Sequence, residues 1–253
     1  MQLRAIGIAA LLAVAGCQSA AGDEEIEILD IDAQGVAADA EAAACPDIGQ
    51  KAYFFWMEPR SAEPGDKIAL FPYWTDMPGA YNDLPPGCLQ NLGVSPEGAA
   101  TFTRQDDGLP IAEISPDVEA GTRMRLDATY NGHSLIGPVD VFRAADNPLV
   151  GTWRQDGEGC PADSAIQELV FTGGGDFSVT WTPFEVYKDY WGTYALDTET
   201  GAIRLDIEGG NQVPGDVVTE GTVSLSDNAM TFDALYFGTP VSAEGGCHAG
   251  FSQ

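Results

Sequence analysis

The chain has few basic residues. Lys and Arg number 11 against 39 Asp and Glu in 253 residues, which gives a formal net charge of −28 at pH 7. Such a chain is repelled by nucleic acid phosphates and by anionic lipid headgroups, so we expect no nucleic acid partner. The acids are spread along the whole chain, and solubility explains them more simply than cation binding does.

Residues that carry metal or nucleophilic chemistry are equally scarce. The chain contains two histidines, His133 and His248, and no Cys-x-x-Cys pair, so we expect neither a metal site nor a cofactor. The segment around Ser134 is not a nucleophile elbow, because Ile136 stands where that motif has glycine. The sequence therefore indicates no catalytic residue, and we predict that the protein is not an enzyme.

The chain also lacks an apolar run of the length that a membrane-spanning helix needs. The apolar run of residues 5–15 is too short for that purpose, but it suits the hydrophobic region of a secretory signal. Arg4 is the only charged residue before residue 23. These features predict export from the cytoplasm.

The end of this run has a specific pattern. Residues 14–17 read VAGC, which resembles the lipobox of bacterial lipoproteins. The resemblance implies cleavage before Cys17 and acylation of that cysteine, which would hold the protein on a membrane through its N-terminal acyl chains. Gln18 follows where inner-membrane lipoproteins tend to carry Asp. The expected location is the bacterial outer membrane, with the protein facing the periplasm or the cell surface.

The composition then divides the chain into four parts. Residues 1–16 form the predicted signal peptide. Residues 17–44 form a predicted flexible tether, because this stretch is acidic, rich in alanine and free of basic residues. Residues 45–147 and 148–253 form two predicted domains, which meet at the turn-forming pair Asn147-Pro148.

The other four cysteines predict disulfide bonds. They are an even set in an exported chain, and oxidising compartments favour their pairing. Three pairings are open; we predict one bond in each domain, between Cys45 and Cys88 and between Cys160 and Cys247.

Both domains are predicted to be all-β. Thirty glycines and 16 prolines favour many short elements, and segments such as RMRLDATY (123–130) alternate apolar and polar residues as half-buried strands do. In residues 45–147, Gly121-Thr122 and Asn131-Gly132 separate such segments before the Val-rich stretch 139–141. This order resembles bacterial Ig-like domains and implies a β-sandwich.

The second domain opens with Gly151-Thr152-Trp153, and a series of short alternating segments follows at nearly even spacing. This layout resembles the lipocalin-like (calycin) family. The resemblance implies a small up-and-down β-barrel in which Trp153 plugs one end.

One aromatic cluster stands out in the second domain. Six aromatic residues fall within fourteen positions: Trp181, Phe184, Tyr187, Tyr190, Trp191 and Tyr194. We predict that Tyr187, Tyr190 and Trp191 are exposed with Lys188 as a ligand or partner surface, whereas Trp181 and Tyr194 face the core. The alternative is that the cluster is barrel core or closes the barrel mouth.

The sequence thus favours an envelope lipoprotein that acts as a non-catalytic binding or structural module. Its expected partners are the membrane and either an envelope protein or a small apolar ligand. One alternative is a lipocalin-like carrier of an apolar or sugar-like ligand, which an apolar barrel cavity would favour. Another is an envelope hydrolase with an unrecognised site, which convergent buried carboxylates would favour.

Overall fold

The computed structural model describes residues 45–253 except 57–59, 78–79, 185–186 and 227. The predicted signal peptide, the tether and Cys17 lie outside these residues. The described part of the chain is almost entirely β structure, with a short 3-10 turn at Pro86–Cys88. The predicted all-β fold is confirmed. None of the helical structure among the described residues is long and apolar enough to cross a membrane.

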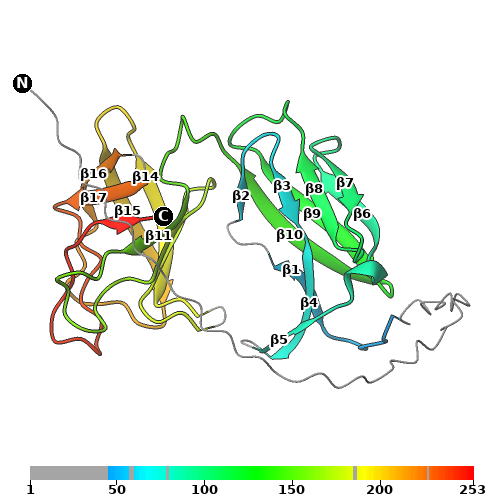
Figure 1. Ribbon diagram of the computed structural model, residues 1–253, viewed down its shortest axis with the longest axis horizontal. Coiled ribbons are helices and arrows are strands. Elements are labelled where there is room, and N and C mark those ends of the chain that lie inside the picture. Colours follow the sequence, from blue (N-terminus) through cyan, green and yellow to red (C-terminus); the bar gives the residue numbers. More distant parts are fainter. Residues whose placement is uncertain (1–44, 57–59, 78–79, 185–186, 227) are drawn as a thin grey trace, which may run out of the picture. The chain divides into compact units, whose positions relative to one another are not determined.

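The N-terminal half forms a sandwich of short sheets (Figure 1). Its sheets have the strand orders β2-β10-β9-β6, β3-β8-β7 and β1-β4-β5. β2 runs parallel to β10, and the other pairs are antiparallel. The strands are β1 (Ala52–Trp56), β2 (Ser61–Ala62), β3 (Lys67–Ala69), β4 (Phe71–Met77), β5 (Ala80–Asp83), β6 (Gln90–Ser95), β7 (Ala100–Arg104), β8 (Pro110–Ile114), β9 (Arg123–Tyr130) and β10 (His133–Val141).

Alternation along the strands builds the sandwich core. On β9, Met124, Leu126 and Tyr130 are buried in one hydrophobic cluster, whereas Arg123 and Arg125 on the opposite face are exposed. Asn131 and Gly132 follow with φ values of 46° and 83°, the left-handed conformation that a two-residue hairpin turn requires. The predicted turn therefore joins β9 to β10.

The C-terminal half is a closed barrel in which successive strands are neighbours, so it has the predicted up-and-down order (Figure 1). β18 pairs with both β11 and β17 and thereby closes the barrel. The strands are β11 (Gly151–Gln155), β12 (Glu168–Phe171), β13 (Asp176–Thr180), β14 (Tyr190–Leu196), β15 (Ala202–Gly210), β16 (Glu220–Ser226), β17 (Ala229–Asp233) and β18 (Phe251–Ser252).

Large side chains fill the barrel interior. Trp153 is 1% exposed, and its indole N–H donates to the Leu149 carbonyl oxygen at 2.8 Å, so its predicted burial is confirmed. Phe171, Phe177 and Tyr190 belong to the same buried cluster. The Phe177 and Tyr190 rings lie edge to face with centroids 6.0 Å apart, which is a favourable aromatic geometry.

Both predicted disulfide bonds are present. Cys45 is bonded to Cys88 across 43 residues, and Cys160 is bonded to Cys247 across 87 residues. The first bond lies in the part of the chain that forms the sandwich, and the second lies in the part that forms the barrel. Each bond therefore restricts the unfolded chain around one of the two cores.

A glycine in β14 permits a close approach between strands. The pairing of β14 with β15 is irregular between Trp191 and Gly192, and a Cβ atom on Gly192 would overlap the Asp206 carbonyl oxygen. We expect Gly192→Ala to lower the free energy of unfolding by roughly 1–3 kcal/mol, because backbone atoms must shift to make room. Urea unfolding measures this change.

Gly215→Ala is the matched control, since no atom lies within 4 Å of the position its Cβ would take. If the two variants unfold at the same urea concentration, the close contact at Gly192 does not constrain the barrel.

Candidate functional site

In the aromatic segment 181–194, where the sequence predicts a binding surface, some aromatic side chains are buried and others are exposed. Tyr190 is fully buried, and its hydroxyl donates to the Phe237 carbonyl oxygen at 2.8 Å. The prediction that Tyr190 is exposed is therefore wrong. Tyr190 is the first residue of β14 and faces the barrel interior, so alternation turns the next residue, Trp191, outward. Burial raises the pKa of Tyr190 far above its ordinary range, with a smaller contribution from the charge of Asp189.

The other members of the segment also separate by face. Trp191 is 41% exposed, as predicted, whereas Tyr187 is half-buried. The Tyr187 hydroxyl donates to Asp189 Oδ1 at 3.2 Å. Trp181 is buried and Tyr194 is packed against the barrel core, also as predicted.

A small hollow of about 280 Å³ surrounds Trp191 on the barrel. Ser178 and Glu208 on the neighbouring strands line it, and so does the half-buried Lys188. The Lys188 Nζ atom lies 3.9 Å from Glu168 Oε2. Of the predicted surface residues, the structure thus brings Trp191 and Lys188 together here and leaves Tyr190 inside the core.

A much larger hollow, of about 1160 Å³, lies against the sandwich and was not predicted from the sequence. We call it the aromatic groove and define it by its lining residues on the strands of the sandwich. These are Ala52, Phe54, Phe55 and Trp56 on β1, Thr75, Asp76 and Met77 on β4, Tyr81 on β5, and Ile136 and Pro138 on β10. Gln50 and the basic residues Lys51, Arg60 and Lys188 also line the hollow, so the predicted surface residue Lys188 borders this groove too.

Three aromatic rings line the aromatic groove, and the ring of Tyr81 contacts the other two. The Tyr81 ring lies 5.2 Å from the Phe54 ring at an interplanar angle of 77°, and 5.7 Å from the Trp56 ring. All three side chains are half-buried and so keep part of their surface open to solvent. Antiparallel pairing of β1 with β4 places Tyr73 opposite Phe54, where the two rings stack at 6.0 Å. The rings are therefore held by a sheet.

A local sequence signal for this groove exists. Residues 53–56 read YFFW, and successive side chains of a strand point to opposite faces. Phe55 is accordingly buried in the sandwich core and Tyr53 packs against that core, which leaves Phe54 and Trp56 on the other face. Four consecutive aromatic residues on a strand cannot all be core, and this rule would have indicated that two of the rings lie outside it.

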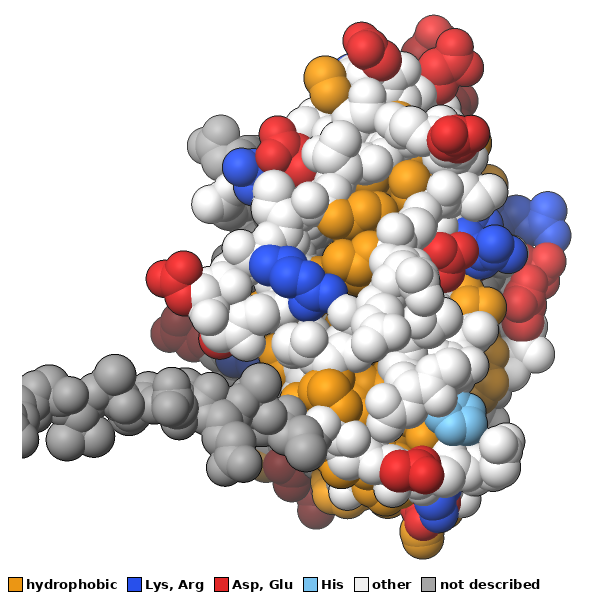
Figure 2. All heavy atoms as spheres, turned by 90° about the vertical axis from the view of Figure 1, so that its right-hand side faces the viewer, with side chains coloured by type: hydrophobic (Ala, Val, Ile, Leu, Met, Phe, Trp, Pro, Cys, Tyr) orange, Lys and Arg blue, Asp and Glu red, His pale blue; other side chains and the backbone are white. Residues whose placement is uncertain are grey.

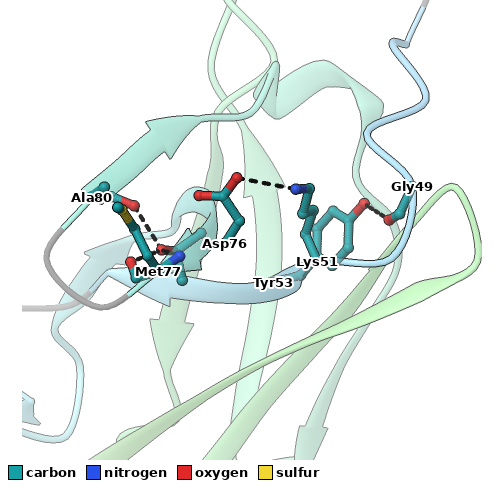
Figure 3. A network of polar contacts seen from close by, with 7 residues as sticks. Gly49, Lys51, Tyr53, Asp76, Met77 and Ala80 are labelled. Atoms are coloured by element: carbon teal, nitrogen blue, oxygen red, sulfur yellow. Dashed lines mark hydrogen bonds and ion pairs between the residues drawn. The ribbon is translucent and has the colours of Figure 1, made fainter.

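Polar contacts support the same strands (Figure 3). Lys51 Nζ lies 3.1 Å from Asp76 Oδ2 and 5.6 Å from the centroid of the Trp74 ring. The Thr75 hydroxyl lies 2.6 Å from the Ala80 carbonyl oxygen across the β4–β5 hairpin. Lys51 and Asp76 both line the aromatic groove, so they supply a hydrogen-bond donor and an acceptor beside the rings.

The face of the molecule shown in Figure 2 differs from the aromatic groove in how its apolar side chains are distributed. Its apolar side chains appear in narrow patches between acidic and basic side chains. Scattered apolar surface of this kind is normal for a soluble domain, whereas touching aromatic rings in a hollow are typical of a contact site.

Two carboxylates are buried elsewhere, and each has its own partners. Asp140 on β10 is 4% exposed; burial raises its pKa, and Arg123, whose Nε lies 3.5 Å away, opposes that shift. Asp189 accepts the Trp181 backbone N–H at 2.8 Å. Among the described residues, no group of three or more His, Cys, Asp or Glu side chains could hold a metal ion. Each of these two carboxylates thus interacts with neighbouring groups of its own, Asp140 with Arg123 and Asp189 with the Trp181 backbone.

The candidate site is therefore the aromatic groove, and Trp191 marks a second, smaller hollow on the barrel. Both expose aromatic rings because strand alternation turns them away from a filled core. Comparison with protein family models, with curated proteins and with solved structures finds no match to this chain.

Proposed function

We propose that the protein is a lipid-anchored envelope lipoprotein and acts as a non-catalytic binding module through its aromatic groove. The contrast between a filled barrel and an open hollow lined by touching aromatic rings carries this proposal. Exposed aromatic surface in a hollow is usually a contact site, because its solvation is unfavourable unless a partner covers it.

The barrel interior supports a binding module over a carrier. A ligand inside the barrel would have to displace Trp153, Phe171 or Tyr190, each of which is at most 1% exposed. Trp153 and Tyr190 also use their polar atoms within the barrel, where each donates to a backbone carbonyl oxygen. Displacing such groups costs both packing and hydrogen bonds.

The proposed location rests on the sequence of residues 14–17 and is supported by the two disulfide bonds. Disulfides persist in oxidising compartments, so two of them in the described residues suit an exported protein. Acyl chains on Cys17 would then hold the folded part at the membrane through residues 18–44.

We expect Cys17→Ser to abolish the acylation that anchors the mature protein when the full chain is produced in a Gram-negative bacterium. The wild-type protein should stay in the membrane fraction in high salt and dissolve in detergent, because acyl chains anchor it through apolar contact. The variant should accumulate as the uncleaved precursor or as a soluble form. Intact mass spectrometry of both proteins measures cleavage and acylation.

Ser19→Ala is the control, because it changes a nearby residue and keeps residues 14–17 intact. A mature wild-type protein without acyl chains, or one cleaved at another residue, would contradict the proposed anchor.

A further inference from the structure

We infer that the aromatic groove binds a long-chain fatty acid, with the apolar chain against the rings and the carboxylate at the basic residues. This inference rests on the proposed binding function and names the chemical class of its ligand. Three features of the groove support it: apolar side chains that are open to solvent, an excess of positive charge, and a small number of uncharged polar groups.

Apolar side chains in the groove are open to solvent. Met77 on β4 and Ile136 on β10 are 55% and 48% exposed, and both line the groove. The rings of Phe54, Trp56 and Tyr81 line it as well and are half-buried. Exposed apolar surface that gathers in a hollow is typical of a contact site. Burial of this surface under an apolar ligand would therefore stabilise a complex.

The shape of the groove favours a long and flexible ligand. The Tyr81 ring is inclined at 77° to the Phe54 ring and at 48° to the Trp56 ring, so the three rings share no plane. A rigid flat ligand can lie against one of these rings at a time, whereas a chain of methylene groups bends and follows them in turn. The hollow measures about 1160 Å³, and pockets for drug-sized molecules measure roughly 300–1,000 Å³. It therefore has room for a long chain.

The charged residues of the groove are mostly basic. Lys51, Arg60 and Lys188 line it, whereas Asp76 is the acid that lines it among the described residues. The whole chain has only 11 Lys and Arg and a net charge of −28, so this concentration of basic residues is unusual within it. A local excess of positive charge favours an anionic group on the ligand.

Arg60 is the basic residue best suited to bind that anionic group. Lys51 Nζ lies 3.1 Å from Asp76 Oδ2. Lys188 Nζ lies 3.9 Å from Glu168 Oε2. Arg60 is exposed, and the described residues include no carboxylate in ion-pair contact with its guanidinium group. A guanidinium group can donate two parallel hydrogen bonds to the two oxygens of one carboxylate.

The position of Arg60 places this carboxylate at the border of the apolar surface. The Arg60 carbonyl oxygen accepts the Asp140 backbone N–H at 2.8 Å, which ties this residue to β10. Arg60 and Lys188 line both the aromatic groove and the smaller hollow around Trp191, so they lie where the two hollows meet. The chain of a fatty acid held there can extend into the groove.

The overall charge of the protein favours a ligand with a single negative charge. Exposed charges separated by more than about 8 Å are largely screened at physiological ionic strength. A single carboxylate in contact with Arg60 therefore responds chiefly to its immediate neighbours. An anionic polymer or an anionic membrane surface extends beyond that distance and meets the other acidic residues of a chain whose net charge is −28.

An acidic polypeptide fits the groove less well than a fatty acid does. Each residue of a peptide brings a backbone N–H and a C=O group, and burying them without partners is unfavourable. Apart from the rings, the uncharged polar side chains among the described lining residues are those of Gln50 and Thr75. The Thr75 hydroxyl already lies 2.6 Å from the Ala80 carbonyl oxygen. A fatty acid has no polar group besides its carboxylate and avoids this cost.

Photo-crosslinking of the full-length protein in phosphatidylcholine vesicles tests this inference. The probe is palmitate with a diazirine in its chain, used at about pH 8.5, where most of the carboxylate is ionised. We expect saturable crosslinks on peptides that contain β1, β4 or β5, identified by mass spectrometry after proteolysis. Crosslinks confined to the barrel or to residues before Cys45, or none that unlabelled palmitate displaces, would overturn the inference.

Competitors separate the role of the carboxylate from that of the chain. Hexadecanol has the chain length of palmitate and no charge, so displacing half of the probe should need at least tenfold more of it than of palmitate. An acidic peptide of Glu and Phe residues should displace little of the probe. Equal potency of hexadecanol and palmitate would overturn the inference, and so would displacement by the peptide as effective as that by palmitate.

Arg60→Met tests the carboxylate site. It removes the guanidinium group and keeps an unbranched apolar side chain, so it should weaken probe binding about tenfold and reduce the preference for palmitate over hexadecanol. Arg204→Met is the matched control, because it removes the same charge from a 67% exposed side chain on β15, outside the groove. Equal probe binding by the two variants would show that Arg60 does not hold the carboxylate, and the assignment would be wrong.

Met77→Ser with Ile136→Ser tests the apolar surface. Both side chains are largely exposed, so the double variant should keep its fold, and it should weaken probe binding about threefold to tenfold. Val241→Ser is the control at an 83% exposed apolar residue outside the groove, and it should bind as the wild type does. Binding by the double variant that matches this control would contradict the placement of the chain.

The outcomes also separate this inference from the proposed function. If the acidic peptide displaces the probe from the groove as well as palmitate does, the fatty-acid assignment fails and the proposed binding module stands. If Cys17 carries no lipid but palmitate crosslinks to the groove, the fatty-acid site stands and the proposed anchor alone fails.

Discussion

Replacing Trp153 by alanine should lower the free energy of unfolding by about 3–5 kcal/mol, as removal of a large buried aromatic side chain usually does. Trp153 is 1% exposed within the barrel core. Its removal leaves a cavity, and it also leaves the Leu149 carbonyl oxygen without the indole N–H that it accepts at 2.8 Å. Both effects act in the same direction, and urea unfolding followed by circular dichroism measures their sum.

Trp191→Ala is the matched control, since it removes the same side chain from the outer face of β14, where the ring is 41% exposed. We expect this variant to lose about 1 kcal/mol or less, because surface substitutions seldom cost more. A loss below 1 kcal/mol for Trp153→Ala would mean that the barrel does not depend on the tryptophan that the sequence places at its end.

The strand with the cleanest alternation was predicted at its observed bounds. β9 spans residues 123–130, the bounds that its alternating sequence predicts. β2 and β18 contain two residues each and were not predicted. A strand that short carries no periodicity of its own, and its pairing with distant strands defines it.

The error at Tyr190 has a specific cause. Residues 181–194 are rich in aromatic residues, but their number does not show which ring faces the core. The face is decided by where β14 begins, since a shift of one residue exchanges the two faces of a strand. Tyr190 therefore faces inward and Trp191 outward, and a count of aromatic residues treats the two alike.

The aromatic groove needed long-range information that a single segment does not contain. YFFW at 53–56 shows that two rings must leave the core, but it does not show where they go. Tyr81 reaches them because β4 pairs with β1 on one side and with β5 on the other. Pairing of this kind depends on the whole sheet. The sequence therefore indicates which rings leave the core, but only the strand order shows that they meet in one groove.

Removing the Cys160–Cys247 disulfide should cost about 4–5 kcal/mol, because the chain-entropy cost of closing a loop of 87 residues has that size. The bond also lies close to the closure of the barrel. Gln155 on β11 donates from Nε2 to the Cys247 carbonyl oxygen at 3.2 Å and to that of Ala249 at 3.1 Å. These contacts precede β18, whose pairing with β11 and β17 closes the barrel.

We therefore expect Cys160→Ala with Cys247→Ala to unfold at a lower urea concentration and to loosen β18 first, which hydrogen exchange at Phe251 would detect. Cys45→Ala with Cys88→Ala is the matched control: its loop of 43 residues should cost about 4 kcal/mol and leave exchange in β18 unchanged. Equal exchange at Phe251 in both double variants would mean that the Cys160–Cys247 bond acts only by restricting the unfolded chain. The bond would then have no part in holding the barrel closed.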